Sequence, residues 1–137
     1  MTLSISRATG ALLLITGLGL AYAADPTVTL TGAQEVPAVT TRATGNAMIT
    51  VATDKSVVGK VTTTGIAGTA AHIHSGAAGE NGPVAIPLVP GSDGEWMVPA
   101  GSKLTDEQFA AYKAGKLYVN VHSDAHKPGE IRTQLKP

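Results

Sequence analysis

The sequence has no cysteine and no excess of charge of either sign, and each absence excludes a class of protein. Without cysteine the chain can form no disulfide, no thiolate nucleophile and no sulfur-rich zinc site, so its stability must come from packing or from a bound ligand. Ten basic residues are balanced by ten acidic ones, which leaves no positive field to attract nucleic acid or anionic lipid. We therefore expect no nucleic-acid partner.

The sequence also lacks the short patterns of several common catalytic sites. It contains no nucleophile elbow and no phosphate-binding loop. The adjacent Asp106 and Glu107 are explained by the favourable dipole at the first turn of a helix, without any catalytic role. These absences argue against a hydrolase.

The N-terminus has the pattern of an export signal. Arg7 supplies a positive charge, Ala11 to Leu20 form an uncharged apolar run, and Ala21-Tyr22-Ala23 fits the small-x-small cleavage pattern. The run is about half the length that a membrane-spanning helix needs. We therefore predict a signal peptide at residues 1–23, no permanent membrane anchor after its removal, and one mature domain at residues 24–137 that is periplasmic or secreted.

The rest of the chain predicts an all-β fold. It is rich in Val, Thr, Ile and Gly, and turn residues recur at the spacing that is typical of a sandwich or barrel. From Asn46 to Ala52, apolar and polar residues alternate, as on a strand with one buried face. The expected strands are Thr27 to Thr31, Asn46 to Ala52, Ser56 to Thr64, Ala70 to His74, Pro83 to Leu88, Glu95 to Val98, Leu117 to His122 and Glu130 to Leu135.

One segment, Thr105 to Ala114, has the signals of a helix. Thr105 and Gln108 have the spacing of a capping box, and Gly115 follows where a C-terminal cap is expected. The predicted fold is thus a Greek-key-like β-sandwich of about eight strands with one short crossover helix.

All four histidines fall in two short segments, 72–74 and 122–126. Residues two apart on a strand point to the same face, so His72 and His74 lie together, opposite Ile73. The same alternation sends the apolar residues of the strand Leu117 to His122 into the core and leaves His122 on the outer face. If the two strands are neighbours, three imidazoles converge on one surface patch.

Further residues can complete such a patch. The connection 123–128 is long enough to bring His126 over as a fourth ligand. A hairpin that pairs His122 with Glu130 places Asn120 opposite Arg132 on the same outer face. We predict that Glu130 and Asn120 hold the ligating histidines in place. The alternative for this row of polar residues is a cross-strand ladder of charges and hydrogen bonds.

An all-imidazole ligand set suits copper, zinc or nickel better than calcium or magnesium, which prefer oxygen ligands. Copper is the expected ion because divalent copper has the highest affinity in this series, and zinc is the alternative. In a competing interpretation, the histidines bind no metal and only hydrogen-bond the loops around them.

Three stretches of the chain resemble the CHRD domain, the family named after chordin. They are Gly32-Ala33-Gln34-Glu35-Val36-Pro37, Ala71-His72-Ile73-His74-Ser75-Gly76 with Asn81-Gly82-Pro83-Val84, and Leu117-Tyr118-Val119-Asn120-Val121-His122 with Pro128-Gly129-Glu130-Ile131-Arg132. The resemblance implies a single-domain exported member of bacterial type. His126 and Thr133 depart from the family pattern.

Two functions compete with a copper-buffering or copper-tolerance protein. The occurrence of the family in extracellular animal proteins implies a non-enzymatic protein-binding or adhesion module with structural histidines. A copper-dependent redox enzyme is the enzymatic alternative, although the sequence offers no acid–base pair and no second metal site to support it.

Overall fold

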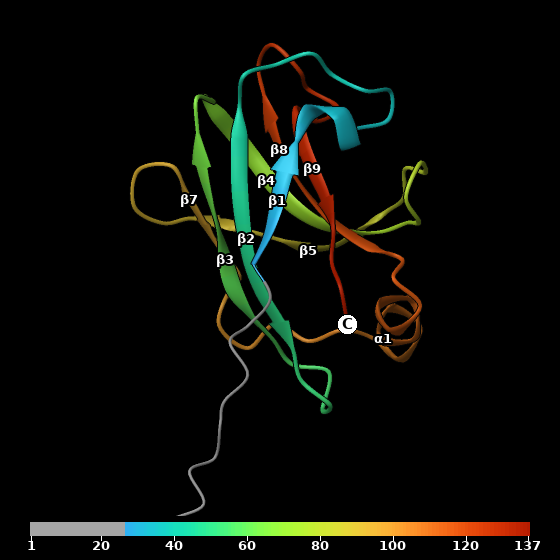
Figure 1. The fold of residues 1–137 in the computed structure, drawn as a ribbon. Helices are drawn as coiled ribbons and strands as arrows, with labels where there is room; N and C mark the ends of the chain where they lie inside the picture. The colour runs from blue at the N-terminus through green and yellow to red at the C-terminus, as the bar shows by residue number, and fades with distance from the viewer. Residues whose placement is uncertain (1–26) are drawn as a thin grey trace, which may run out of the picture.

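The computed structural model describes residues 27–137 (Figure 1). The predicted signal peptide, residues 1–23, and its cleavage site after Ala23 lie outside the described residues. Among residues 27–137, no helix is long and apolar enough to cross a membrane.

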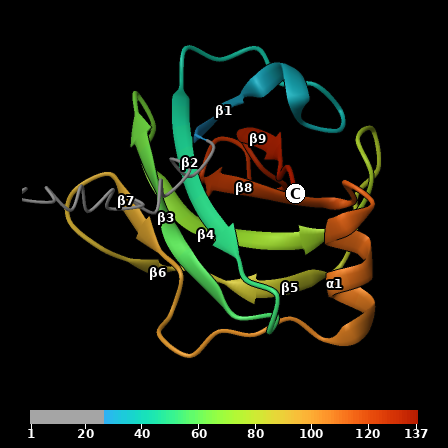
Figure 2. The same ribbon diagram turned by 60° about the horizontal axis from the view of Figure 1, so that its bottom comes forward.

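Nine strands form one antiparallel sheet in the order β5-β4-β8-β9-β1-β2-β3-β7-β6. The strands are β1 (Thr27–Thr31), β2 (Thr44–Val51), β3 (Val57–Thr64), β4 (Gly68–Ser75), β5 (Val84–Pro87), β6 (Val89–Pro90), β7 (Glu95–Met97), β8 (Leu117–Ser123) and β9 (Ile131–Gln134). The two end strands, β5 and β6, are separated in the chain only by Leu88, so the sheet curls round until its ends nearly meet (Figure 2).

The predicted all-β class is confirmed. In place of the two packed sheets of the predicted sandwich, the strands form a single, nearly closed sheet. The eight predicted strands are present, with ends that differ from the prediction by at most two residues, and the two-residue strand β6 is the additional one. A short 3₁₀ helix, Gly32–Gln34, follows β1.

The predicted helix is α1, Asp106–Lys113, which connects β7 with β8 across the molecule. Both hydrogen bonds of the capping box are present, because Gln108 N donates to Thr105 Oγ1 at 3.1 Å and Thr105 N donates to Gln108 Oε1 at 2.9 Å. Gly115 follows the helix with φ +72°, a conformation that glycine adopts without strain.

The inner face of the curled sheet is the hydrophobic core. On β2, Ala47 and Ile49 are buried while Asn46 and Met48 are exposed, which confirms the predicted alternation. On β4 and β8, Ile73, Val119 and Val121 have no exposed surface. The histidines of these strands therefore lie on the outer face, as their positions predict.

The sequence predicts that this outer face is open to solvent, but part of it is covered in the structure. Tyr118 and Asn120 are each only 2% exposed. The loop 76–82 folds over Tyr118, and Gly82 N donates to the hydroxyl of this tyrosine at 3.1 Å. Asn120 instead lies against Gly129. A Cβ atom at Gly82 would lie 1.6 Å from the carbonyl oxygen of Ser75, so only glycine allows the loop to approach so closely.

Candidate metal centre

Three histidines from two neighbouring strands meet on the partly covered outer face. β4 pairs with β8 so that His72 is opposite Asn120 and Ala70 is opposite His122. The ring centroids lie 4.8 Å apart for His72 and His122 and 5.5 Å apart for His72 and His74. One ring nitrogen from each of the three lies within 4.8 Å of the others. Nitrogens sharing a zinc or copper ion lie about 3 to 4 Å apart, so small side-chain rotations would complete a common site.

Backbone carbonyl groups fix the orientation of two of these rings. His74 Nδ1 lies 2.9 Å from the carbonyl oxygen of Gly82, and His122 Nδ1 lies 2.7 Å from that of Lys127. A carbonyl oxygen only accepts, so each Nδ1 carries the proton and each Nε2 carries the lone pair. Ligating histidines in metal sites commonly make this kind of bond with the nitrogen that does not bind the ion.

The lone pairs of these two rings differ in their surroundings. His122 Nε2 lies 3.0 Å from Nδ1 of His72, which donates a hydrogen bond to it. His74 Nε2 is buried and has no hydrogen-bond partner among the described residues. A metal ion bound by all three rings would replace the hydrogen bond between His72 and His122 and would give Nε2 of His74 a partner.

The ring of His74 is held by stacking. It lies parallel to the ring of Tyr118, with the centroids 4.7 Å apart and an interplanar angle of 1°. The guanidinium group of Arg132 lies 3.4 Å from the centroid of the same tyrosine ring. Since His74 is on β4, Tyr118 on β8 and Arg132 on β9, three neighbouring strands together fix this imidazole.

Burial favours the neutral form of His72 and His74. It lowers the pKa of both, and electrostatic repulsion lowers it further, from His122 and His74 at His72 and from His122 and Arg132 at His74. The hydrogen bond to the Gly82 carbonyl partly offsets the effect of burial on the pKa of His74. Neutral imidazoles are the form that binds metal ions, so the electrostatics suit such a site.

His126, the fourth predicted ligand, is not a member of this three-histidine group. It lines a separate hollow of about 150 Å³ together with Glu35, Pro37 and Pro128. Its backbone N–H donates to Ser123 Oγ at 3.1 Å, which ties the connection back to β8.

The carboxylate of Glu130 does not hydrogen-bond His122, the residue that we predicted it to orient. Its carboxylate accepts hydrogen bonds from Thr41 Oγ1 at 2.6 Å and from Ser123 Oγ at 2.5 Å. Burial acts to raise the pKa of Glu130, but these two bonds outweigh it and leave the pKa below its usual value. The partner of His122 Nδ1 is the carbonyl group of Lys127, which no side-chain pattern in the sequence indicates.

Asn120 is at the centre of the site. The predicted register is confirmed, with Asn120 opposite Arg132 and Tyr118 opposite Gln134. The Oδ1 atom of Asn120 is buried without a hydrogen-bond partner, as is Oε1 of Glu35.

Burial raises the pKa of Glu35 to about 7, against the lowering effects of Asn120, Arg132 and the backbone of Val36. The position of Glu35 in the motif before Val36-Pro37 was the available sequence signal for this residue.

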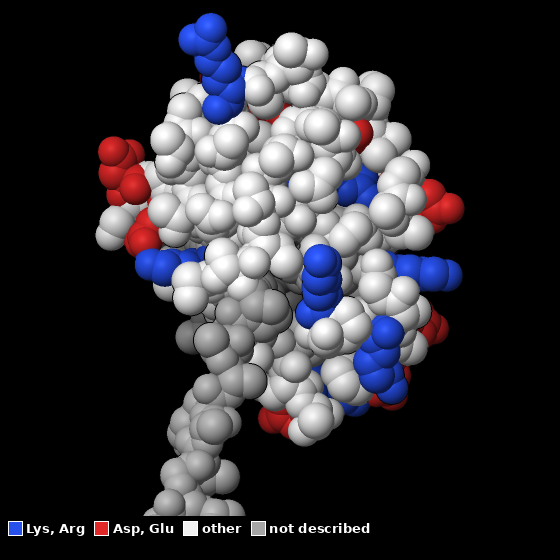
Figure 3. All heavy atoms as spheres, viewed as in Figure 1, with Lys and Arg blue, Asp and Glu red and all other residues white. Residues whose placement is uncertain are grey.

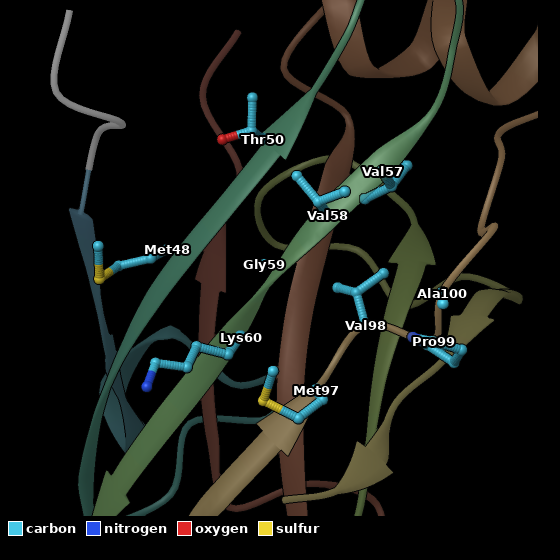
Figure 4. A pocket seen from close by; sticks show the side chains of 10 residues that line it. All are labelled: Met48, Thr50, Val57, Val58, Gly59, Lys60, Met97, Val98, Pro99 and Ala100. Atoms are coloured by element: carbon cyan, nitrogen blue, oxygen red, sulfur yellow. The ribbon is translucent and has the colours of Figure 1, made fainter. Parts of the chain in front are cut away.

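Another hollow, of about 440 Å³, lies on the outer face of β2, β3 and β7 (Figure 4). Its lining includes Met48, Val58 and Met97, and its only charged residue is Lys60. Met48 and Met97 are both opposite Lys60 in the sheet, and β9 and β1 separate their strands from β8. With no imidazole or carboxylate in its lining, this groove does not have the chemistry of the histidine cluster.

On the face in Figure 3, acidic and basic side chains are interspersed.

Fold and site together define a class: a small all-β domain whose single curled sheet has a partly buried three-histidine cluster on its outer face. A family model of the CHRD domain matches residues 27–135. The chain therefore belongs to the CHRD domain family. No curated protein and no solved structure matches it.

Proposed function

We propose that this protein binds one transition-metal ion through His72, His74 and His122. Three imidazole nitrogens suit copper, zinc or nickel, and among divalent ions copper has the highest affinity for such ligands. Copper is therefore the proposed ion and zinc the alternative. The function that follows is the buffering of copper, or tolerance to it, without catalysis.

One observation carries the proposal: Nε2 of His74 is buried and unpartnered, while Nδ1 of the same ring is bonded to a carbonyl group. A buried acceptor without a partner is unfavourable by about 1 to 3 kcal/mol, so such atoms are rare in folded proteins. His122 Nε2 also carries its lone pair, because Nδ1 of that ring is bonded to a carbonyl group. This lone pair accepts a hydrogen bond from His72 Nδ1, which a bound ion would replace.

The proposal includes export. Its support is the sequence pattern of Arg7, the apolar run and Ala21-Tyr22-Ala23. The chain then acts in the periplasm or outside the cell. Mass spectrometry of protein from that compartment should find an N-terminus at or near Ala24, whereas an intact chain retained in the cytoplasm would disprove export.

The first test of metal binding is a shift in melting temperature. An ion that binds only the folded chain stabilises it by about 2.7 kcal/mol at 100 times its Kd, which raises the melting temperature of a domain of this size by about 10 °C. Cu(II) or Zn(II) should produce this shift in the wild type, measured without a histidine tag.

The variants His72→Ala and His122→Ala should each lose most of the shift, because each removes one of the three ligands. His126→Ala is the matched control, since it removes an imidazole from outside the group, and it should keep most of the shift. Equal shifts in all four proteins would leave the histidines with a structural role and favour the protein-binding module instead.

A further inference from the structure

Three buried side-chain atoms have no hydrogen-bond partner among the described residues: Glu35 Oε1, His74 Nε2 and Asn120 Oδ1. They come from three separate parts of the chain, yet Asn120 adjoins both of the others. Its cross-strand neighbour is His72, and its side-chain amide also shifts the pKa of His74 and that of Glu35. Unpartnered buried atoms that gather at one place indicate a group that they share.

The orientation of the Asn120 amide follows from its contacts near Gly129. A Cβ atom at Gly129 would lie 2.6 Å from Asn120 Nδ2 and 2.4 Å from Glu35 Oε1. The amide nitrogen and the carboxylate oxygen therefore both lie beside Gly129. Gly129 has φ +135° and no side chain, and both properties are needed for this close approach.

With Nδ2 beside Gly129, Oδ1 is on the other side of the planar amide, and Asn120 itself lies opposite His72 in the pairing of β4 with β8. Oδ1 is an acceptor, and His74 Nε2 is also an acceptor because Nδ1 of that ring is bonded to the Gly82 carbonyl. Two adjacent acceptors repel each other unless a cation or a donor lies between them. The hydrogen bond to Gly82 fixes which nitrogen of His74 carries the lone pair, and the position of Nδ2 beside Gly129 leaves Oδ1 on the side of the amide away from that glycine.

We propose that Oδ1 of Asn120 is a fourth ligand of the ion held by His72, His74 and His122, and that it selects the divalent state of copper. This inference rests on the proposed function of the histidine cluster. An amide oxygen is a hard ligand, which suits Cu(II) or Zn(II), whereas Cu(I) prefers soft sulfur ligands and is well held by imidazoles alone. The protein would then retain Cu(II) and hold Cu(I) less selectively.

Isotope labelling tests this ligand in the unaltered protein. The full-length mature chain is prepared with ¹³C in the side-chain carbonyl of asparagine, loaded with Cu(II), and measured by electron–nuclear double resonance. A ligating Oδ1 places its carbonyl carbon next to the ion and gives a ¹³C coupling. The other two asparagines are engaged elsewhere, because Asn81 Oδ1 accepts from Arg132 at 3.3 Å and Asn46 Oδ1 from Thr29 at 3.3 Å.

Affinity measurements on variants provide the second readout. Asn120→Leu should weaken Cu(II) binding by about tenfold or more and leave Cu(I) binding within about threefold. Asn120→Asp keeps an oxygen ligand and should restore Cu(II) binding, which a purely structural role of the amide would not do. Asn46→Asp on the exposed face of β2 is the matched control and should change neither affinity.

The outcomes separate this inference from the function on which it rests. A wild type that binds no Cu(II) overturns both. A wild type that shows imidazole couplings but no ¹³C coupling, with Cu(II) affinity unchanged in Asn120→Leu, overturns only the fourth ligand. A water molecule donating to both acceptors would then be the group that they share.

Discussion

At the scale of single residues, Glu35 has an unusual carboxyl group. It is 6% exposed, adjoins Asn120 and Gly129, and has a pKa raised from 4.5 to about 7, mainly by burial. Because its pKa is higher in the folded than in the unfolded chain, the folded state binds the proton more tightly. The contribution of Glu35 to stability is therefore complete below pH 4.5 and is lost as the pH rises through about 7.

The variant Glu35→Gln tests this direction of the pH dependence of stability. Glutamine is neutral at every pH, so it resembles the protonated carboxyl group and avoids the burial of a charge. We expect the variant to be more stable than the wild type at pH 8, by about 2 to 3 kcal/mol, and to differ little at pH 4.5.

Denaturant unfolding of the metal-free proteins at the two pH values measures the difference. The histidines titrate in the same range, but they are present in both proteins and cancel in the comparison. A difference in unfolding free energy that is the same at pH 4.5 and pH 8 would mean that Glu35 does not change its ionisation in this range.

At the scale of elements, Arg132 fixes the loop 76–82 to β9. Its Nη2 donates to the carbonyl oxygen of Ala77 at 3.0 Å and to Gln134 Oε1 at 3.0 Å, and its Nη1 donates to Asn81 Oδ1 at 3.3 Å. The loop ends at Gly82, whose carbonyl group orients His74. Arg132 thus acts on the ring of His74, and so on the proposed metal centre, through the loop.

Arg132→Lys should lower the unfolding free energy by about 2 to 4 kcal/mol, because an ammonium group cannot make three directed bonds and also stack on Tyr118. Metal affinity should fall by about tenfold, the usual effect of losing a group that orients a ligand. Unfolding curves and competition titrations measure the two effects. The exposed Arg42→Lys is the control, and a destabilised Arg132→Lys with unchanged affinity would contradict the role of the loop.

The elements themselves were largely predictable from sequence. The strand β2 follows the period of two, and α1 carries both halves of its capping box in Thr105 and Gln108. The strand β6 was not predicted because its two residues, one of them proline, are too short to show a pattern.

The cover over the outer face was also not predictable. Alternation places Tyr118 opposite the core, but its burial depends on the loop 76–82. That loop is held by bonds between residues about fifty positions apart, such as Arg132 and Ala77. The carbonyl groups of Gly82 and Lys127 belong to the backbone, so no residue type indicates their role at the histidines.

At the scale of the whole molecule, the curled sheet separates two kinds of surface. The histidine cluster lies on β4 and β8, while the apolar groove with Met48 and Val58 lies on the outer face of β2, β3 and β7. The inner face is occupied by the core, and two core residues, Val57 and Val98, also border the groove.

The proposed metal binding should depend on pH. Burial lowers the pKa of His72 and His74 below 6.5, so these two imidazoles remain unprotonated, and able to bind an ion, to a lower pH than free imidazole does. The melting-temperature shift caused by Cu(II) should persist at pH 6.5 and fade below about pH 6 as protons displace the ion. Thermal scans with and without metal at each pH measure it, and a shift that is constant from pH 7.5 to 5 would exclude imidazole ligands.

The most direct test of the central claim is calorimetric titration of the untagged mature protein with Cu(II) at pH 7.5, beside the His72→Ala, His122→Ala double variant. The three-histidine site predicts one ion per wild-type chain, and at least a hundredfold weaker binding in the double variant, because two of three ligands are gone. Both proteins should have similar circular dichroism spectra, since the rings of His72 and His122 are only partly buried. Equal affinity and stoichiometry in the two proteins would contradict the claim.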